Sequence, residues 1–334
     1  MLTVKSFGIN SAELADFQNF AIKLYHIDLF WQKDDELPPS EYLPRFFLAW
    51  RDGEVVGRAV AMINRGIAYQ GRRTGLIGFY EAIDDLHVAQ LLFENVFAYL
   101  RDQTCNYIIG PINGSTWNHY RITEPRNNKP FLLDNYHKDW YYKHFLVAGF
   151  ATIAKYSSRK VTELAGPYPR LLKYEALFRN KGILIRSINL ADFETELAKI
   201  YTISINSFKS NFLYTPLNWA DFVRMYQQVR SLVDPKFVLI AEREAGEPLG
   251  FIFSLPNAYE PLQRSLVIKT VAVVSQTEAK GLGTLMAEKI HKLASENGYQ
   301  EVIHALMHER NQSNNILAQN SQSYQRYVLL GRKL

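Results

Sequence analysis

The segment Thr270–Leu293, TVAVVSQTEAKGLGTLMAEKIHKL, constrains the fold of this 334-residue chain more than any other. Its first residues are apolar and β-branched, which predicts a strand, and its second half carries apolar residues at helical spacing, which predicts an amphipathic helix. Between them, Gly281 and Gly283 predict a tight turn whose backbone a ligand can approach, because glycine has no Cβ. The free N–H groups at the start of such a helix favour a phosphate. The sequence therefore predicts an anion-binding unit of strand, glycine turn and helix.

The composition is that of an ordinary soluble globular protein. Apolar residues make up 47% of the chain and charged residues 21%, and the length allows two domains. The net charge is +5 without a basic block or tail, so no nucleic-acid partner is expected. The single cysteine, Cys105, excludes an internal disulfide and suits a reducing compartment. We read no signal peptide and no apolar run long enough for a bilayer, so we expect a cytoplasmic protein without a membrane partner.

The second half of the chain alternates predicted strands and helices. The segment Thr162–Tyr174, with two prolines and a glycine, is the expected junction that precedes it. The turn Arg243–Glu247 lies between two apolar runs and predicts a hairpin. The expected order is strand 182–188, helix 191–207, helix 219–232, strand 236–241, strand 248–255, strand 265–274, a helix to about 297, strand 301–307, a polar helix around 312–319 and strand 324–330.

The first half repeats this order weakly, which predicts two copies of one fold. It lacks a glycine turn after GFYEAIDD, where Leu86, His87 and Val88 follow instead. We therefore expect a phosphate loop in the second copy alone and one ligand site per chain. The elements expected in the first half are helix 11–25, strand 45–50, strand 55–63, strand 74–81, helix 87–101 and strand 107–109.

The second half resembles the GCN5-related N-acetyltransferase superfamily. Beyond the order of elements, the hairpin FVLIAEREAGEPLGFIFSL is similar to the family's second and third strands. The segment TVAVVSQTEAKGLGTLM resembles its acyl-CoA-binding signature, and Asn311, after EVIHALM, resembles its Asn-containing motif. The first half resembles a degenerate member through GFYEAIDD and IIGPINGSTWN. The whole chain is similar to tandem acetyltransferase-like proteins.

This resemblance implies an α/β (α+β) fold class with two tandem acyl-CoA N-acyltransferase-like domains. Each domain would have a mixed, mostly antiparallel central sheet flanked by helices. Residues 1–165 would form the degenerate domain without a phosphate loop, and residues 166–334 the acyl-CoA-binding domain. The implied activity is acetyl-CoA-dependent transfer of an acyl group to an amine of an unknown small-molecule or peptide acceptor.

The resemblance also implies how acetyl-CoA, or another acyl-CoA, would bind. Its arm would follow the strand before the glycine turn, and its pyrophosphate would contact backbone N–H groups of the turn. The signature's Arg/Gln position falls on Glu278, whose charge would oppose the pyrophosphate, so we expect Glu278→Gln to tighten binding. No metal is expected. The expected cofactor-binding residues are Val271, Ala272, Val273, Ala279, Lys280, Gly281, Leu282, Gly283, Thr284 and Asn311.

The catalytic groups are harder to assign. Transfer to an amine needs a base for the amine and an acid for the departing thiolate. His308 and Glu309, just after a predicted strand, are the candidate catalytic residues, each as the base. Tyr324 and Tyr327 fall on the last predicted strand, where packing is the better interpretation. Lys269 stands near where some members of the family carry a carboxylate base.

Two alternative functions and the role of one segment remain open at this point. A non-catalytic CoA-binding or scaffold protein on a decayed acetyltransferase fold would bind the cofactor without turnover, or not bind it at all. A tandem-fold aminoacyl or long-chain acyl transferase would need a tRNA site or an acyl-chain site. The segment GPINGSTWNHYRI of the first half could line a substrate cleft, although an ordinary loop whose polar side chains satisfy turns is favoured.

Overall fold

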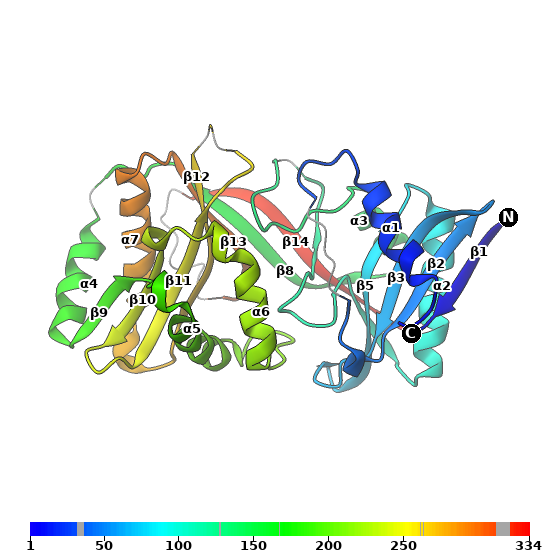
Figure 1. Cartoon of the computed structure of the whole chain (residues 1–334), viewed down its shortest axis with the longest axis horizontal. Helices are drawn as coiled ribbons and strands as arrows, with labels where there is room; N and C mark the ends of the chain where they lie inside the picture. Colours follow the sequence, from blue (N-terminus) through cyan, green and yellow to red (C-terminus); the bar gives the residue numbers. More distant parts are fainter. Residues whose placement is uncertain (32–36, 127, 167, 261, 263, 312–320) are drawn as a thin grey trace.

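The chain forms an elongated molecule of two lobes with one sheet running through both, and the two termini lie in the same lobe (Figure 1). The structure is a computed structural model that describes residues 1–31, 37–126, 128–166, 168–260, 262, 264–311 and 321–334. The predicted polar helix around residues 312–319 lies outside the described residues.

The first lobe contains most elements of the N-terminal half of the chain. Helices α2 and α3 pack on one face of its strands through a core that includes Leu92, Phe93 and Phe145. Helix α1 covers the other face through Phe17. The elements of this lobe are β1 (Leu2–Phe7), α1 (Leu14–Leu24), β2 (Arg45–Arg51), β3 (Glu54–Met62), β4 (Ala68–Tyr69), β5 (Arg72–Ala82), α2 (Leu86–Asp102), β6 (Tyr107–Gly110), β7 (Ile122–Thr123) and α3 (Tyr141–Val147).

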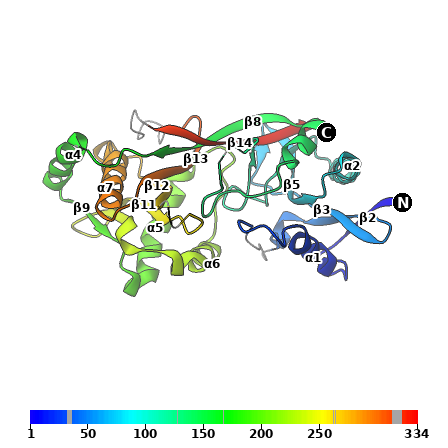
Figure 2. The same ribbon diagram turned by 90° about the horizontal axis from the view of Figure 1, so that it is seen from above.

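The second lobe is also built in three layers. Helices α4 and α7 pack on one face of the sheet through side chains such as Phe178 and Leu285. Helices α5 and α6 cover the other face through Leu197 and Phe222, and Figure 2 shows the two helical layers on either side of the strands. The elements are α4 (Pro169–Asn180), β9 (Ile183–Ser187), α5 (Phe193–Phe208), α6 (Trp219–Val229), β10 (Val238–Arg243), β11 (Pro248–Pro256), β12 (Ser265–Val273), α7 (Leu282–Glu296) and β13 (Glu301–His308).

Two long strands join the lobes. Strand β8 (Ala151–Val161) pairs with β13 of the second lobe, and β14 (Gln322–Lys333) pairs with β6 of the first. The two strands also pair with each other, and they run side by side from lobe to lobe (Figure 2). The path of the sheet is β1-β2-β3-β5-β6-β14-β8-β13-β12-β11-β10-β9. The last strand of the chain therefore completes the sheet of the first lobe, and the domain boundary at residue 165 stays a prediction.

The mixed fold class and the tandem arrangement predicted from the sequence are confirmed. Both predicted hairpins are present, because Gly53 and Gly246 supply the positive φ angles of 87° and 85° that their turns require. The interpretation of Thr162–Tyr174 as a connecting segment is wrong in its second part. Helix α4 begins at Pro169, where proline suits the first turn because its missing N–H has no intrahelical partner.

Candidate functional site

Strands β12 and β13 separate halfway along their length. Their parallel pairing runs from Ser265 and Glu301 to Ile268 and His304 and stops there, although β12 continues to Val273 and β13 to His308. The register between β11 and β12 shifts at the same level, as at a β-bulge, which bends a strand away from its neighbour. The end of β12 therefore presents its edge to a groove instead of to β13, and backbone groups on such an edge need other partners.

The N-terminus of α7 opens into the same groove. Gly281 begins the helix with a φ of 96°, and no side chain caps it. The first intrahelical hydrogen bond runs from the N–H of Leu285 to the carbonyl of Gly281, and the N–H groups of the first turn have no intrahelical acceptor. Gly283 and Thr284 line the groove. A Cβ on Gly281 would lie 3.0 Å from the ring of Tyr174, so this loop is held closely against α4.

The groove lies between the two lobes and has a volume of about 1930 Å³. Nine of the ten predicted cofactor-binding residues line it; the tenth, Leu282, has its side chain fully buried beneath the loop. This volume exceeds the 300–1,000 Å³, roughly, of a typical single-ligand pocket. Residues of the first lobe, including Tyr69 and Tyr120, form part of its lining. The predicted cofactor residues therefore share one groove, but their role stays a prediction.

Glu278 does not line this groove. Its carboxylate pairs with the guanidinium of Arg243, which also binds Glu247 at 2.8 Å. Its backbone carbonyl accepts a hydrogen bond from Lys181 at 3.1 Å. The expectation that its charge opposes a bound pyrophosphate is therefore corrected, because Arg243 neutralises the carboxylate on the side of the β10–β11 hairpin.

His308 and Glu309 also line the groove, at the end of β13. The ring of His308 lies 4.9 Å from that of Tyr156 and 6.1 Å from that of Phe212, centroid to centroid. Its Nδ1 accepts a hydrogen bond from the N–H of Arg310 at 3.1 Å, which assigns the proton of the neutral ring to Nε2. Burial lowers the pKa of His308, and the charge of Arg310 lowers it further. Glu309 and Asn311 are exposed at the rim.

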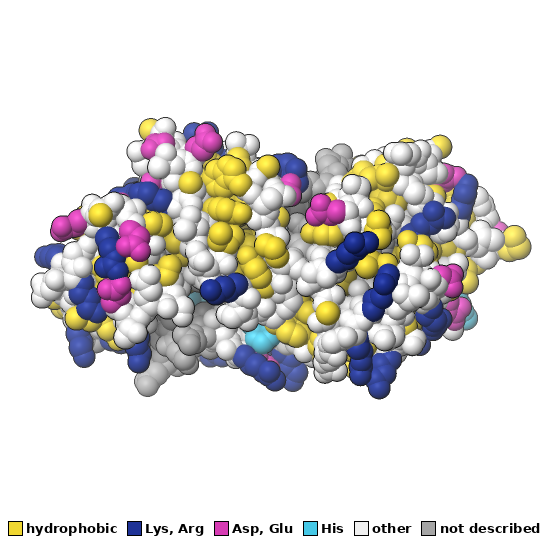
Figure 3. Space-filling model, turned by 90° about the horizontal axis from the view of Figure 1, so that it is seen from below, with side chains coloured by type: hydrophobic (Ala, Val, Ile, Leu, Met, Phe, Trp, Pro, Cys, Tyr) yellow, Lys and Arg dark blue, Asp and Glu magenta, His cyan; other side chains and the backbone are white. Residues whose placement is uncertain are grey.

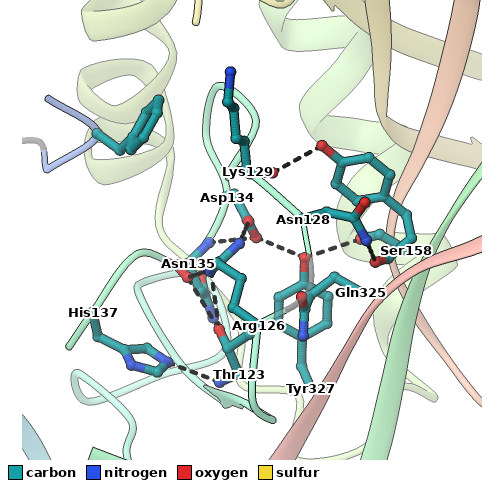
Figure 4. Close-up of polar contacts among 12 residues, drawn as sticks. Thr123, Arg126, Asn128, Lys129, Asp134, Asn135, His137, Ser158, Gln325 and Tyr327 are labelled. Atoms are coloured by element: carbon teal, nitrogen blue, oxygen red, sulfur yellow. Dashed lines mark hydrogen bonds and ion pairs between the residues drawn. The ribbon is translucent and has the colours of Figure 1, made fainter. Parts of the chain in front are cut away.

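The tyrosines of the last strand have structural partners away from the groove. Tyr327 is fully buried and donates to Asp134 at 2.7 Å, and Ser158 donates to its hydroxyl at 3.2 Å. Asp134 also pairs with Arg126 at 2.7 Å (Figure 4). Tyr324 donates to the carbonyl of Lys129 at 2.8 Å. The interpretation of both tyrosines as packing residues is consistent with these contacts.

Lys269 lies at the point where β12 leaves β13. Its ammonium group donates to the carbonyl of Leu133. Burial lowers the pKa of Lys269 to about 7, and Arg121 lowers it while Asp134 raises it. Lys269 does not line the groove, and its side chain ties the 131–137 loop to β12. Sequence reasoning gave no signal for this contact, because the loop belongs to the first half of the chain.

The equivalent opening in the first lobe is filled by the chain itself. Pairing of β5 with β6 stops at Leu76 and Ile109, and beyond this point Phe79 donates its N–H to the side chain of Asn113 at 2.8 Å. A Cβ on Gly78 would lie 2.4 Å from the carbonyl oxygen of Ile112. The remaining cavity is about 120 Å³. The side chain of Asn113 therefore satisfies a backbone N–H group, as expected for the ordinary loop that the sequence interpretation favoured.

The N-terminus of α2 is capped by a side chain of the protein itself. Asp85 accepts hydrogen bonds from the N–H groups of His87 and Val88 at 2.8 and 3.3 Å. The same carboxylate pairs with Arg51 at 2.6 Å. A carboxylate of the chain thus occupies the helix N-terminus that would otherwise favour an anion. That the first copy lacks a phosphate site stays a prediction.

Comparison with known proteins identifies the class of fold. A tandem GNAT protein from the clavulanic acid biosynthesis pathway superposes with a TM-score of 0.54 at 11% identity, covering 100% of this chain and 98% of that one. The chain therefore has the fold of the tandem GCN5-related N-acetyltransferases. No family model matches its sequence.

Two curated proteins are similar in sequence. Protein YghO of Escherichia coli is 28% identical over 273 residues, which cover 76% of this chain and 68% of that protein. The bacterial ceramide synthase of Caulobacter vibrioides is 24% identical over 246 residues, which cover 70% of this chain and 63% of that protein. The matches thus span about two thirds of each relative.

Two further observations concern the part of the chain that the structure describes. No helix there combines the length and the apolar character needed to cross a bilayer. No group of three or more His, Cys, Asp or Glu side chains there could hold a metal ion.

Proposed function

We propose that this protein is an acyl-CoA-dependent N-acyltransferase with one cofactor site per chain, in the groove between the lobes. The observation that carries the proposal is the separation of β12 from β13 beside the uncapped N-terminus of α7. Beyond Ile268 the edge of β12 has no strand beside it and offers backbone groups to an amide-rich arm, although the Val273 carbonyl already accepts a hydrogen bond from Ser207 at 3.0 Å. The N-terminus of α7 offers N–H groups to a phosphate. The tandem acetyltransferase fold supports the same function by analogy.

The residues present fit an acyl-CoA. Backbone groups of Val271 and Val273 would bind the arm, and the N–H groups of Gly281–Thr284 would hold the pyrophosphate beside the charge of Lys280. When bound, acyl-CoA supplies an acyl group activated as a thioester. The pairing of Glu278 with Arg243 removes the main electrostatic objection to this assignment.

Two side chains at the end of β13 fit the proton transfers of the reaction. Glu309 is exposed at the rim, where its carboxylate can accept a proton from an amine. His308 carries its neutral-ring proton on Nε2, because Nδ1 accepts from Arg310. We assign Glu309 as the acceptor of the amine proton and the Nε2–H of His308 as the hydrogen-bond donor to the leaving thiolate, which then takes up the proton that Glu309 received.

The acceptor remains an amine of undefined structure in this proposal. The name of the Caulobacter relative favours one candidate, because a ceramide is an amide of a long-chain amine. N-acylation of such an amine is therefore the second, narrower candidate function. A cytoplasmic location stays a prediction.

Cofactor binding and turnover test the proposal separately. Acetyl-CoA at about 100 times its dissociation constant should stabilise the fold by about 2.7 kcal/mol, measured as a shift in Tm. Lys280→Glu should weaken this stabilisation, and Lys173→Glu, an exposed lysine of α4 outside the groove, is the matched control. No shift in the wild type at millimolar acetyl-CoA would reject the cofactor site. Binding without thiol release, whatever amine is supplied, would instead support the non-catalytic alternative.

A further inference from the structure

The half of the groove that faces the first lobe is lined by aromatic and aliphatic side chains together with Gln70, Thr152 and Lys155. Four rings follow one another from β8 to β4: Tyr156 contacts His308 at 4.9 Å, His308 contacts Phe212 at 6.1 Å, and Phe212 contacts Tyr69 at 6.1 Å, centroid to centroid. We call Tyr156, His308, Phe212 and Tyr69 the aromatic wall. All four line the groove, so a continuous surface of aromatic rings leads from His308 to the first lobe.

The surroundings of the aromatic wall are also apolar. Ile153, Leu213 and Leu306 line the same part of the groove and pack against the core of the first lobe. Among the described lining residues that the first lobe and β8 contribute, Lys155 is the one charged side chain. Seen from below, hydrophobic side chains gather in the middle of the molecule, with Lys and Arg side chains around them (Figure 3). Such a surface favours a hydrocarbon over a polar ligand.

The position of the wall indicates which substrate it contacts. The proposed cofactor arm follows the edge of β12 at Val271–Val273, on the second-lobe side of the groove. The aromatic wall runs from β8 past the end of β13 to β4, on elements other than β12. A molecule on the wall and a cofactor arm on β12 would therefore contact different linings of one groove, and this leaves the wall for the acceptor.

We propose that the acceptor is a primary amine that carries a hydrocarbon chain, and that this chain lies along the aromatic wall. This inference rests on the proposed function, and it adds the chemical class of the acceptor. The amine would sit next to His308 and Glu309, and the chain would extend past Phe212 to Tyr69. Both of these rings are half-buried, so they offer apolar surface that a chain can cover.

The first test compares amines of different length with acetyl-CoA as the donor. Each methylene buried on the wall should raise kcat/KM about fourfold, so dodecylamine, kept below its micelle concentration, should exceed propylamine by at least about a hundredfold. The measurement is the release of free thiol. Equal kcat/KM for the two amines would overturn the inference and leave the proposed function intact. The inference would also be overturned if kcat/KM depended on the chain length of the acyl donor but not on that of the amine.

The second test uses variants of the wall. The double variant Tyr69→Ser/Phe212→Ser should lower the ratio of kcat/KM for dodecylamine to kcat/KM for propylamine at least tenfold. The single variant Tyr69→Phe, which leaves Phe212 unchanged, should keep most of the wild-type ratio. Tyr142→Ser is the control, because Tyr142 is a half-buried tyrosine of the first lobe outside the groove. A wall variant that keeps the wild-type preference would reject the placement of the chain.

A binding measurement separates this inference from the proposed function. Calorimetric titration of the wild type with dodecylamine, without cofactor, should show saturable binding that the double wall variant weakens at least tenfold and Tyr142→Ser does not. If acetyl-CoA fails to bind while this pattern holds, the proposed function fails and the amine site stands. If dodecylamine binds the double variant as tightly as the wild type, the amine site is rejected.

Discussion

The Nε2 atoms of His291 and His304 lie 2.8 Å apart in the core of the second lobe. His291 belongs to α7, whose first turn faces the groove, and His304 is the last residue of β13 that pairs with β12. Both rings are buried. Burial lowers the pKa of His291 to about 4, and burial together with His291 lowers the pKa of His304 well below its usual value. One neutral ring therefore donates to the other, and a proton on the acceptor would break this contact.

This pair predicts that acid destabilises the protein. A histidine whose pKa is lower in the folded state binds fewer protons than in the unfolded chain between pH 6.5 and about pH 4. The free energy of unfolding is therefore retained above pH 6.5 and falls as the pH drops through that window, by roughly 3 kcal/mol for His291 alone. Urea unfolding at a series of pH values measures this loss.

The variants His291→Gln and His304→Gln isolate the contribution of the pair. Each should flatten the dependence of stability on pH, although His137, whose pKa is also lowered to about 4 by burial, will leave a residual slope. His26→Gln, at an exposed position, should not change the slope. A wild-type stability that is constant from pH 7 to pH 4.5 would contradict the prediction.

Glu278→Gln should change the affinity for acetyl-CoA less than about twofold. The pairing of Glu278 with Arg243 already neutralises the carboxylate, and the side chain lies outside the groove, so the tightening expected from the sequence is withdrawn. Half-exposed ion pairs contribute little to stability, about 0–1 kcal/mol, so the Tm should also change little. Isothermal titration with acetyl-CoA checks this, and a clear gain in affinity would return Glu278 to the pyrophosphate site.

His308→Gln should lower kcat by about 10²–10³-fold, because it removes the imidazole that donates its Nε2–H to the leaving thiolate. His308→Ala should have a similar effect on kcat. Because burial lowers the pKa of His308, the neutral ring predominates at pH 7, and protonation below the lowered pKa leaves the Nε2–H in place, so titration of His308 itself should not lower wild-type kcat. Stopped thiol-release assays across pH 5–8 measure both effects. A variant that keeps kcat within twofold would remove His308 from the mechanism.

Local sequence patterns predicted the turns and hairpins whose geometry depends on adjacent residues. The glycine turn before α7 and the two hairpins follow from residues adjacent in sequence, such as Gly281 and Gly53, whose positive φ angles these turns require. The pairing of β14 with β6 could not be predicted, because it joins residues as distant as Leu330 and Gly110. Strand choice at such a distance depends on the packing of the whole sheet.

The site was predictable to the same extent. Most of the predicted cofactor residues belong to the single segment 271–284, and Asn311 follows the next strand. A local sequence motif was therefore enough to predict them. The partner of Glu278 and the aromatic wall were not predictable, since Arg243 lies on a separate hairpin and Tyr69, Tyr156 and Phe212 come from three distant segments. Side-chain contacts of this kind depend on the tertiary structure, and the sequence alone offers no periodicity that reveals them.

The filled opening of the first lobe predicts a stoichiometry of one acetyl-CoA per chain. Asn113 takes the N–H of Phe79, and Asp85 takes the first N–H groups of α2, so the backbone groups equivalent to the cofactor site already have partners. Asp85→Ala should lower the free energy of unfolding by about 1 kcal/mol through the lost cap, and Asn113→Ala by about 1–3 kcal/mol through the unpaired N–H. Neither variant should change the affinity or the stoichiometry of acetyl-CoA, because both sites lie outside the groove between the lobes. Titration calorimetry measures both quantities, and two equivalents bound by the wild type would show that the first lobe opens to admit a second cofactor.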